Sequence, residues 1–421
     1  MYYSLYDRLL SQESLHRAFR KVKANAGKPG IDGQTVEEFA QDMAGEIVML
    51  VRELRDKSYR PKPVKRVVIP KDGGGERELG IPTVRDRVVQ QALLEILQPI
   101  FDPTFHPSSY GYRPGHSAHQ AIAKAEMFIR KYGLRHVADM DLSRCFDTLN
   151  HELILGGIRK RVADGSVLGL VRQFLRSGVM TGDGFVEVEE GSPQGGVISP
   201  LLANIYLDAF DQEMKKRGHR IVRYADDILI LTRSKSAAEN ALKQASRYLE
   251  EELKLTVNRQ KTEVVHSDDG VKFLGMEIGT VYTRIREKKV CGFKDKVRKI
   301  TRRNSPVNLV KVIKDLNPIL RGFANYFKAA NCGEVFKALA QWIRRRLRAK
   351  QLKLWKKPKR LHRRLRQLGY KGEFKKIKMS TWRNSASPLA SWALSNDYLR
   401  ELGLFDLCRV RTAATASSKR G

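Results

Sequence analysis

The stretch Arg220-Ile221-Val222-Arg223-Tyr224-Ala225-Asp226-Asp227-Ile228-Leu229-Ile230-Leu231 places two short apolar runs on either side of a polar centre. This pattern predicts a strand, a tight turn and a second strand. The adjacent carboxylates of Asp226 and Asp227 repel each other, and divalent metal is the simplest neutraliser because Mg²⁺ prefers hard oxygen ligands. Taken alone, the pair is equally typical of a solvated turn rich in aspartate.

A second apolar strand with carboxylates is predicted at residues 136–142. Asp139 and Asp141 are two residues apart, so their side chains share one face of that strand. Periodicity alone leaves open which of the two carboxylates matters. A third carboxylate on a separate strand makes a metal site more plausible than an isolated acidic turn.

Residues 64–81 have the pattern of a β-hairpin with the turn Asp72-Gly73-Gly74-Gly75. No Gly-Lys-Ser/Thr follows and no helix begins there, so the P-loop interpretation is rejected. Lys71 and Arg77 lie on the two arms, where two cations can close over a triphosphate. A Gly/Pro-rich loop at residues 191–200 leads into a predicted helix over 201–217. That loop suits close approach to a phosphate or base, but it is also typical of a plain helix entry.

The charge of the chain is strongly uneven. Residues 1–280 carry a net charge of +3, whereas residues 281–421 carry +30 of the total +33. Such asymmetry indicates a polyanionic partner, either nucleic acid or an acidic membrane surface. No segment pairs this charge with a strong apolar face, so a membrane partner is not expected.

Length and composition bound the class of protein. A chain of 421 residues with 42% hydrophobic residues is expected to form two or three domains with real cores. The four cysteines are widely spaced, which excludes a zinc ribbon and a disulfide framework and agrees with a reducing cytosol. No apolar run approaches the ~20 residues needed to span a bilayer, and no secretory signal is found. We therefore expect a soluble, cytoplasmic protein.

The basic third is predicted to be helical, with aromatic residues interleaved among its cations. Residues 317–327 mix aromatics with amides and Arg321, and residues 342–357 carry Trp342, Trp355 and a run of arginines. This pattern suits base stacking combined with phosphate contact. It also suits a helix with an apolar core stripe and a solvated basic face, and both can hold at once.

Ten motifs in order resemble the group II intron-encoded reverse transcriptases, or maturases, of bacteria. The resemblance covers about residues 5 to 405 and rests on residues 30–33, 69–75, 79–83, 110–115, 139–142, 146–147, 192–196, 224–227, 273–275 and 321–327. It implies an α+β right-hand polymerase of fingers, palm and thumb, with an antiparallel palm sheet and an α-helical basic thumb called domain X. The implied segments are an N-terminal extension (1–60), fingers and palm (61–280), thumb and domain X (281–385), and a short C-terminal DNA-binding-like segment with a disordered tail (386–421).

The resemblance also implies roles for individual residues. Asp141, Asp226 and Asp227 match the carboxylates that hold two Mg²⁺ ions, which favours Asp141 over Asp139. Phe146 matches the steric gate against a 2′-hydroxyl, and residues 273–275 match the primer grip. The residues matched to nucleotide binding are Lys71, Arg77 and Gln194, with Lys261 as the lysine that protonates pyrophosphate. The residues expected to bind RNA are Arg321, Asn325, Tyr326, Trp342, Arg344, Arg345, Arg346 and Arg348.

The implied function is an RNA-directed DNA polymerase that also assists splicing and retrohoming of its intron. The implied partners are group II intron RNA, an RNA template with a DNA primer, dNTPs and target DNA. Because no Cys/His cluster follows the thumb, we expect no H-N-H endonuclease domain. Two alternatives remain: a related polymerase in host repair, phage defence or diversity generation, and a polymerase-silent splicing chaperone.

Overall fold

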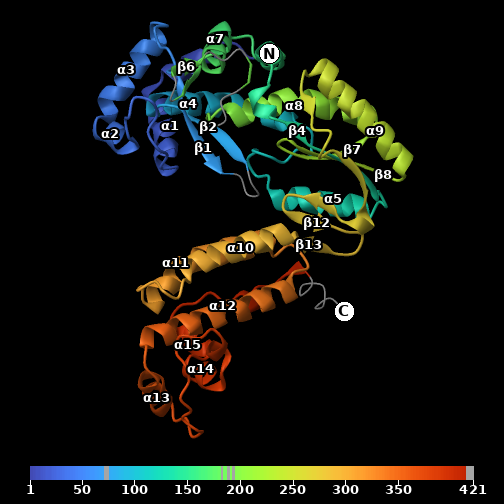
Figure 1. Cartoon of the computed structure of the whole chain (residues 1–421). Helices are drawn as coiled ribbons and strands as arrows, with labels where there is room; N and C mark the ends of the chain where they lie inside the picture. The colour runs from blue at the N-terminus through green and yellow to red at the C-terminus, as the bar shows by residue number, and fades with distance from the viewer. Residues whose placement is uncertain (71–74, 182–183, 187–189, 192–194, 414–421) are drawn as a thin grey trace. The chain divides into compact units, whose positions relative to one another are not determined.

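The computed structural model describes residues 1–70, 75–181, 184–186, 190–191 and 195–413. The chain divides into two compact units, unit 1 (Met1–Leu274) and unit 2 (Gly275–Gly421) (Figure 1). The four-segment division expected from the sequence is finer than this and stays a prediction.

Unit 1 begins with helices that bury one apolar face each. Helix α1 turns Leu15, Phe19 and Val22 inward, and all three side chains are buried. Thr35 and Glu38 form a reciprocal capping box at the start of α2. The helices and helical turns of unit 1 are η1 (Tyr6–Leu10), α1 (Gln12–Ala24), α2 (Val36–Gln41), α3 (Met43–Arg55), α4 (Val84–Phe101), η2 (Asp102–Thr104), α5 (Ala118–Arg130), η3 (Cys145–Asp147), α6 (His151–Arg159), α7 (Gly165–Leu175), α8 (Ser199–Lys216), α9 (Lys235–Arg247), η4 (Tyr248–Glu252) and η5 (Ser267–Asp269).

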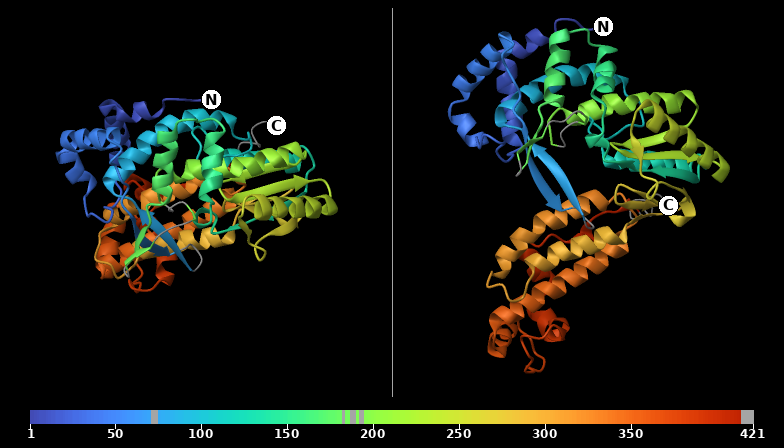
Figure 2. Two further views of the ribbon diagram at one scale, coloured as in Figure 1. Left: turned by 90° about the horizontal axis from the view of Figure 1, so that it is seen from above. Right: turned by 45° about the horizontal axis from the view of Figure 1, so that its top comes forward.

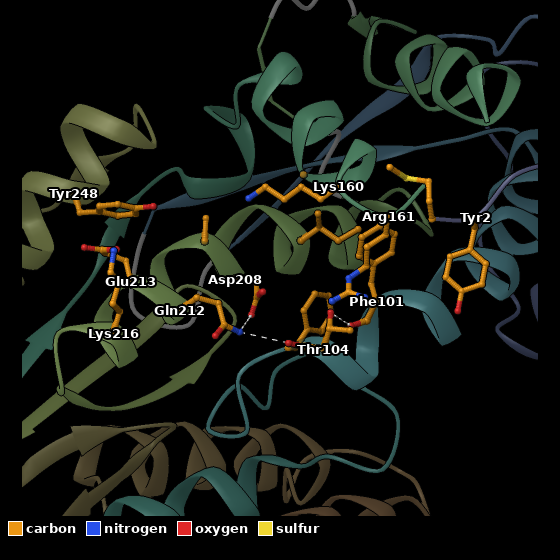
Figure 3. Close-up of a pocket in the computed structure, with 15 residues that line it drawn as sticks. Tyr2, Phe101, Thr104, Lys160, Arg161, Asp208, Gln212, Glu213, Lys216 and Tyr248 are labelled. Atoms are coloured by element: carbon orange, nitrogen blue, oxygen red, sulfur yellow. Dashed lines mark hydrogen bonds between the residues drawn. The ribbon is translucent and has the colours of Figure 1, made fainter. Parts of the chain in front are cut away.

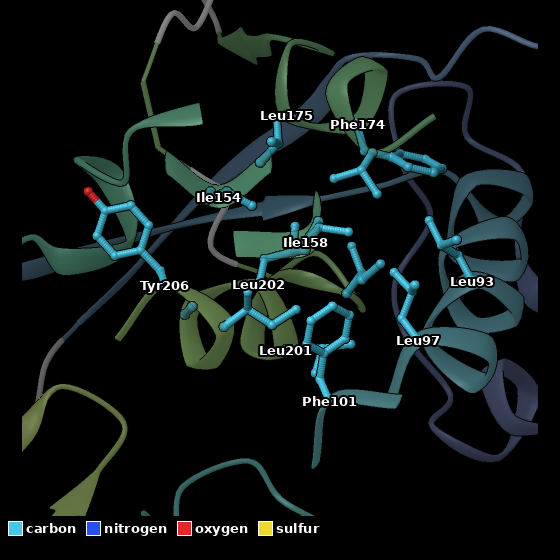
Figure 4. Packing of buried hydrophobic residues seen from close by; sticks show 14 of the residues in the cluster. Leu93, Leu97, Phe101, Ile154, Ile158, Phe174, Leu175, Leu201, Leu202 and Tyr206 are labelled. Carbon is cyan, nitrogen blue, oxygen red and sulfur yellow. The ribbon is translucent and has the colours of Figure 1, made fainter. Parts of the chain in front are cut away.

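Part of the core of unit 1 lies where α4, α6, α7 and α8 meet (Figure 4). Leu93 and Leu97 of α4 face Ile158 of α6 and Leu201 of α8 across this core. Every one of these side chains is almost fully removed from solvent. At ~25 cal/mol per Å² of buried apolar surface, the cluster is the main stabilising term for the platform that carries the site.

The palm sheet has four antiparallel strands in the order β10-β3-β8-β7. Its strands are β3 (His136–Met140), β7 (Arg220–Tyr224), β8 (Asp227–Thr232) and β10 (Glu263–His266). Helix α9 packs on β3 and β8, while α5 and α8 contact β7. The strand–turn–strand at residues 220–231 is present as β7 and β8, and the strand predicted at 136–142 is present as β3, which ends at Met140. The prediction of an antiparallel palm sheet is confirmed.

A second sheet has the order β2-β1-β5-β6. The hairpin of β1 (Val64–Pro70) and β2 (Glu76–Ile81) reaches away from the helices of unit 1 (Figure 2). Strands β5 (Val179–Thr181) and β6 (Gly184–Val186) form the second hairpin. The β1–β2 hairpin was expected from the sequence, but the parallel pairing of β1 with β5 that joins the two hairpins was not. The remaining short strands are β4 (Leu142–Ser143), β9 (Thr256–Val257), β11 (Val271–Phe273), β12 (Met276–Ile278) and β13 (Thr283–Ile285).

Unit 2 is helical apart from the antiparallel pair β12–β13. Its helices and helical turns are α10 (Glu287–Ile300), α11 (Leu309–Phe327), α12 (Gly333–Trp355), α13 (Pro358–Gln367), η6 (Arg383–Ala386), α14 (Pro388–Ala393), α15 (Asn396–Glu401) and η7 (Leu407–Arg409). Phe293 of α10 stacks on Phe323 of α11 with ring centroids 4.1 Å apart. None of the described helices is both long and apolar enough to cross a membrane. The expected helical basic third is confirmed.

Candidate active site

The register of the palm sheet brings the predicted aspartates together. Strands β3 and β8 pair up to Met140 opposite Ile228, and the same register extended by one residue would place Asp141 opposite Asp227. Directly opposed residues of an antiparallel pair have Cβ atoms about 5 Å apart. Asp139 lies on the same face as Asp141, because side chains alternate along a strand. The carboxylates therefore gather at one end of the sheet.

The Asp-Asp turn is a two-residue hairpin loop. Tyr224 pairs with Asp227, which leaves Ala225 and Asp226 as the two loop residues. Ala225 has a φ of 57°, in the left-handed region that primed hairpin turns require. A non-glycine residue held there costs roughly 1–2 kcal/mol. The surrounding structure must therefore stabilise this turn.

A fully buried arginine holds the turn from behind. Arg223 Nε and Nη2 donate to both carboxylate oxygens of Asp211, at 2.6 to 2.9 Å. Its Nη1 donates to the carbonyl oxygen of Ala225 at 3.0 Å and to Asn204 Oδ1 at 3.1 Å. The Arg223 and Asp211 side chains have no solvent exposure, so the ion pair is rigidly placed.

Gly111 lies directly against the same turn. Asn204 Nδ2 donates to the Gly111 carbonyl oxygen at 2.8 Å. A Cβ atom at position 111 would lie 2.3 Å from the Ala225 nitrogen, so only glycine fits. Tyr110 N donates to the Arg223 carbonyl oxygen, which adds this loop to the open edge of β7. The sequence analysis did not predict that these residues support the Asp-Asp turn. The one signal in the sequence was Arg223, a charged residue inside an otherwise apolar strand.

The carboxylates share one strongly negative environment. The pKa of Asp139 is raised to about 7, first by burial and then by the charges of Asp227, Glu263 and Asp141. Burial raises the pKa of the Cys145 thiol to about 12, with the Asp226 charge adding to the shift. Carboxylates that repel one another in this way fit a divalent cation, which would relieve the repulsion.

Asp141 has partners from its own chain. Lys261 Nζ and Asn258 Nδ2 each lie 3.1 Å from Asp141 Oδ2, and Asn258 N donates to its carbonyl oxygen. Within the described residues, no group of three or more His, Cys, Asp or Glu is arranged closely enough to hold a metal ion. The Lys261 ammonium thus stands beside a carboxylate where a bound cation is expected. Sequence reasoning placed Lys261 at the pyrophosphate and did not foresee this pair.

Phe146 lies in the turn η3, five residues after Asp141. Its ring is buried and meets the half-exposed ring of Tyr112 edge-on, with centroids 6.3 Å apart. Gly195, the glycine of the Pro-Gln-Gly motif, comes close to the first hairpin, because a Cβ there would lie 2.3 Å from the Gly80 carbonyl oxygen. Lys71 and Gln194 lie outside the described residues. The backbone of Arg77 pairs with Ile69 in the β1–β2 hairpin.

Comparison with known proteins identifies the family. Residues 69–278 match the model of reverse transcriptase (RNA-dependent DNA polymerase), and residues 290–369 match the group II intron maturase-specific domain. Protein YkfC of Escherichia coli is 35% identical over 323 residues, covering 67% of this chain and 85% of YkfC. The chain belongs to the group II intron reverse transcriptases. The family, the reverse transcriptase fold and the polymerase class predicted from the ordered motifs are confirmed.

Two other relatives of this reverse transcriptase are proteins of introns. The group II intron-encoded protein LtrA of Lactococcus lactis is 28% identical over 379 residues, which are 74% of this chain and 61% of LtrA. A putative COX1/OXI3 intron 2 protein of Saccharomyces cerevisiae is 27% identical over 321 residues, which are 62% of this chain and 37% of that protein. Reverse transcriptases generally use divalent metal ions.

In the maturase-specific domain, the predicted RNA-binding arginines have internal partners. Arg344 pairs with Asp406 at 2.7 Å, and both side chains are 13% exposed. Arg346 donates to Thr301 Oγ1 and lies over the Trp342 ring. Arg348 donates to the Leu394 carbonyl oxygen and to Asn396. These three side chains therefore also hold unit 2 together.

The other predicted RNA-binding residues differ in exposure. Arg321 and Asn325 are exposed one helical turn apart on α11, and Arg321 also lies 4.8 Å over the Phe405 ring. Tyr326 is partly buried and meets Phe327 edge-on. Arg345 is partly buried and lies 5.6 Å over the Trp382 ring. Arg321 and Asn325 are thus the most accessible of the predicted set.

A cavity of about 710 Å³ in this reverse transcriptase lies elsewhere in unit 1 (Figure 3). Lys160, Lys216, Asp208 and Glu213 line it, so cations and carboxylates are mixed. Gln212 donates to Asp208 Oδ1 and weakly to the Thr104 carbonyl oxygen within it. None of the predicted site residues that the structure describes lines this cavity, so we do not assign it to the reaction.

Proposed function

We propose that this chain extends a DNA primer on an RNA template, with Asp141, Asp226 and Asp227 holding two Mg²⁺ ions. The observation that carries the proposal is the β3–β8 register, because Asp141 and Asp227 each lie one residue beyond its last pair, Met140 opposite Ile228. When bound, two Mg²⁺ ions would activate the primer 3′-hydroxyl and offset the charge of the leaving pyrophosphate. The charges of Asp227 and Asp141 raise the pKa of the neighbouring Asp139, and oxygen ligands in such a negative environment fit that role.

The chain's own residues orient the reactants. The buried Arg223 and the close approach of Gly111 fix the turn that carries Asp226 and Asp227. The Phe146 ring, packed against Tyr112, is the surface that would exclude a 2′-hydroxyl and select dNTPs. Lys71, Arg77 and Gln194 would contact the triphosphate, and positive groups there stabilise the developing charge.

Lys261 is assigned two successive positions in this proposal. Before nucleotide binding it neutralises Asp141 at 3.1 Å. When cations bind the carboxylate, its ammonium would be released toward the pyrophosphate, where it would donate a proton. Its side chain is 67% exposed, so the movement meets little steric resistance.

We also propose that unit 2 binds group II intron RNA and assists splicing and retrohoming in the cytoplasm. The net charge of +30 over residues 281–421 supports this role, because phosphate contacts dominate affinity for RNA. The match to the maturase-specific domain at residues 290–369 supports it independently. Target DNA and the template–primer duplex would share the same basic surface.

The polymerase proposal is tested by single-turnover extension of a DNA primer annealed to RNA, over a Mg²⁺ titration. We expect synthesis that depends on Mg²⁺ with an order above one, since two ions take part. The splicing proposal is tested by comparing affinities for intron RNA and for a generic RNA–DNA primer-template over a salt series. A clear preference for the intron supports a maturase, whereas equal affinities contradict the splicing role.

A further inference from the structure

A second pocket, of about 560 Å³, lies at the far end of the β7–β8 hairpin from the Asp-Asp turn. Four cations line it: Lys124 of α5, Lys215 of α8, Arg220 at the start of β7 and Arg233 just after β8. No Asp or Glu is among the described residues that line it. The pocket therefore concentrates positive charge in a unit that is nearly neutral as a whole.

The positive charge of this pocket is not neutralised by ion pairs. None of the four cations forms an ion pair with any other residue that the structure describes. Two carboxylates of α8, the helix that carries Lys215, are already engaged, since Asp211 binds Arg223 and Asp208 accepts hydrogen bonds from His106 N and Gln212. Like charges that converge in this way raise the local potential for an anion.

His106 is a buried residue of this pocket, and two of the pocket's cations act on it. Burial lowers its pKa, the charge of Asp211 opposes this shift, and the charges of Lys215, Arg223 and Lys124 lower the pKa further. Both lysines are therefore close enough to act on one point inside the pocket. Anion binding would relieve the same repulsion.

Aromatic rings line the same pocket. Tyr132 is 50% exposed, and its ring lies 6.1 Å from the buried ring of Phe128. Lys124 Nζ lies 5.0 Å from the Phe128 centroid, so a cation borders the rings. An exposed ring bordered by cations is the arrangement that binds single strands, through base stacking and phosphate contacts together.

The pocket is separate from the reaction centre. Arg220 is at one end of the five-residue strand β7 and the Asp-Asp turn follows the other end. At ~3.3 Å per residue, the two ends are about 13 Å apart. A nucleotide held at the aspartates does not reach this pocket.

We propose that this pocket is a second nucleic-acid site, which binds a single strand by stacking one base on Tyr132 and placing its phosphates on Lys124, Lys215, Arg220 and Arg233. RNA and DNA strands share this chemistry. An acidic peptide would use the cations but not the exposed ring, so the ring favours nucleic acid. The site is independent of the polymerase and splicing proposals.

The test uses the full chain with photoreactive oligouridylate RNA and oligothymidylate DNA. The pocket variant replaces Lys124, Lys215, Arg220 and Arg233 with Gln. The matched control makes the same change at Lys160, Lys216, Lys243 and Lys254, four exposed lysines of unit 1 outside the pocket. Tyr132→Ala removes the ring on which a base would stack, whereas Tyr132→Phe keeps the ring and removes only its hydroxyl. Thermal unfolding of each variant verifies that it is folded.

We expect ultraviolet crosslinks at Tyr132 in the wild type, abolished in the pocket variant and retained in the control. Tyr132→Ala should lower affinity about tenfold, as for one stacked base, and Tyr132→Phe should not. The slope of the logarithm of the binding constant against the logarithm of salt concentration should become shallower by about 0.7 for each phosphate that the variant no longer neutralises. The stronger crosslink of the two oligonucleotides identifies the strand bound. Absence of crosslinks at Tyr132, equal affinity of pocket and control variants, or displacement by polyglutamate but not by oligonucleotide would overturn the proposal.

Discussion

The Nη1 atom of Arg223 donates a hydrogen bond of 3.0 Å to the carbonyl oxygen of Ala225, the residue that carries the positive φ of the Asp-Asp turn. Arg223 also forms a solvent-free ion pair with Asp211 of α8. The geometry of Asp226 and Asp227 therefore depends on a side chain that points away from them into the core. Arg223 acts as a positioning residue for the turn.

Arg223→Lys tests this dependence. Lysine keeps the charge opposite Asp211 but lacks the planar fork that reaches Asp211, Asn204 and Ala225 together. We expect primer extension to fall about tenfold or more, with unchanged primer-template affinity. Arg223→Met should lower the free energy of unfolding by about 3–5 kcal/mol, because it leaves Asp211 buried and unpaired. The matched control is Arg217→Lys, at an exposed pair with Glu213. Wild-type extension by a folded Arg223→Lys variant would show that the turn needs no such support.

Gly111→Ala tests the close approach on the other side of the turn. The added Cβ would lie 2.3 Å from the Ala225 nitrogen, so the backbone must shift. We expect a stability loss of about 1–3 kcal/mol and a marked fall in extension rate. Gly156→Ala, on α6 with no atom within 4 Å of the new Cβ, should be neutral or slightly stabilising. Urea unfolding and extension assays on both variants decide the point. Equal stability and equal extension rates for Gly111→Ala and Gly156→Ala would contradict the close packing of Gly111 against the turn.

Lys261→Ala separates its two assigned positions. Removing the ammonium 3.1 Å from Asp141 should lower the Mg²⁺ concentration for half-maximal extension, by up to about fivefold for a partly exposed pair. If Lys261 also protonates pyrophosphate, the maximal rate should fall in the same variant. Lys235→Ala, at an exposed pair with Glu239, is the control. If the Mg²⁺ concentration for half-maximal extension is the same in Lys261→Ala as in the wild type, Lys261 does not compete with the cation for Asp141.

The arginines of α12 and α13 should behave differently. Arg344→Gln and Arg348→Gln should lower the melting temperature of unit 2, because these side chains bind Asp406 and the Leu394 carbonyl oxygen. Arg360→Gln and Arg363→Gln, at exposed positions of α13, should weaken intron RNA binding at unchanged melting temperature. Calorimetry combined with filter binding over a salt series measures both effects. If Arg344→Gln instead lost RNA affinity at an unchanged melting temperature, Arg344 would be an RNA-binding residue without a structural role.

The local sequence pattern was sufficient to predict the strands and the turn that carry the carboxylates. Alternation and turn chemistry predicted the β7–β8 hairpin, and the resemblance selected Asp141 where periodicity left Asp139 open. The two aspartates differ in their place in the sheet, since Asp139 is paired between Leu229 and Glu263, whereas Asp141 lies just past the last pair of β3 with β8. That distinction depends on register between distant strands.

The contacts that hold the Asp-Asp turn in place could not be predicted from the local sequence pattern. Arg223 is fully buried although arginine is almost never so unless paired, and its partner Asp211 comes from a helix. Asn204 and Gly111 reach the same turn from two further segments. In α12, helical spacing predicts an apolar core stripe, and Leu347 is buried there. It gave no sign that residues near 394–406 bind Arg344 and Arg348.

The central claim is that the carboxylates at the end of the β3–β8 pair carry DNA synthesis. Its most direct test is the single-turnover rate of dNTP addition on an RNA template with Mg²⁺, for Asp141→Asn and Asp227→Asn against Asp269→Asn, an exposed aspartate of η5. Losing a cation ligand removes several kcal/mol of transition-state stabilisation, so both site variants should be slower by roughly a thousandfold or more at unchanged RNA affinity. The Asp269→Asn variant should extend the primer like the wild type. Extension by Asp141→Asn or Asp227→Asn within about tenfold of the wild-type rate would contradict the account.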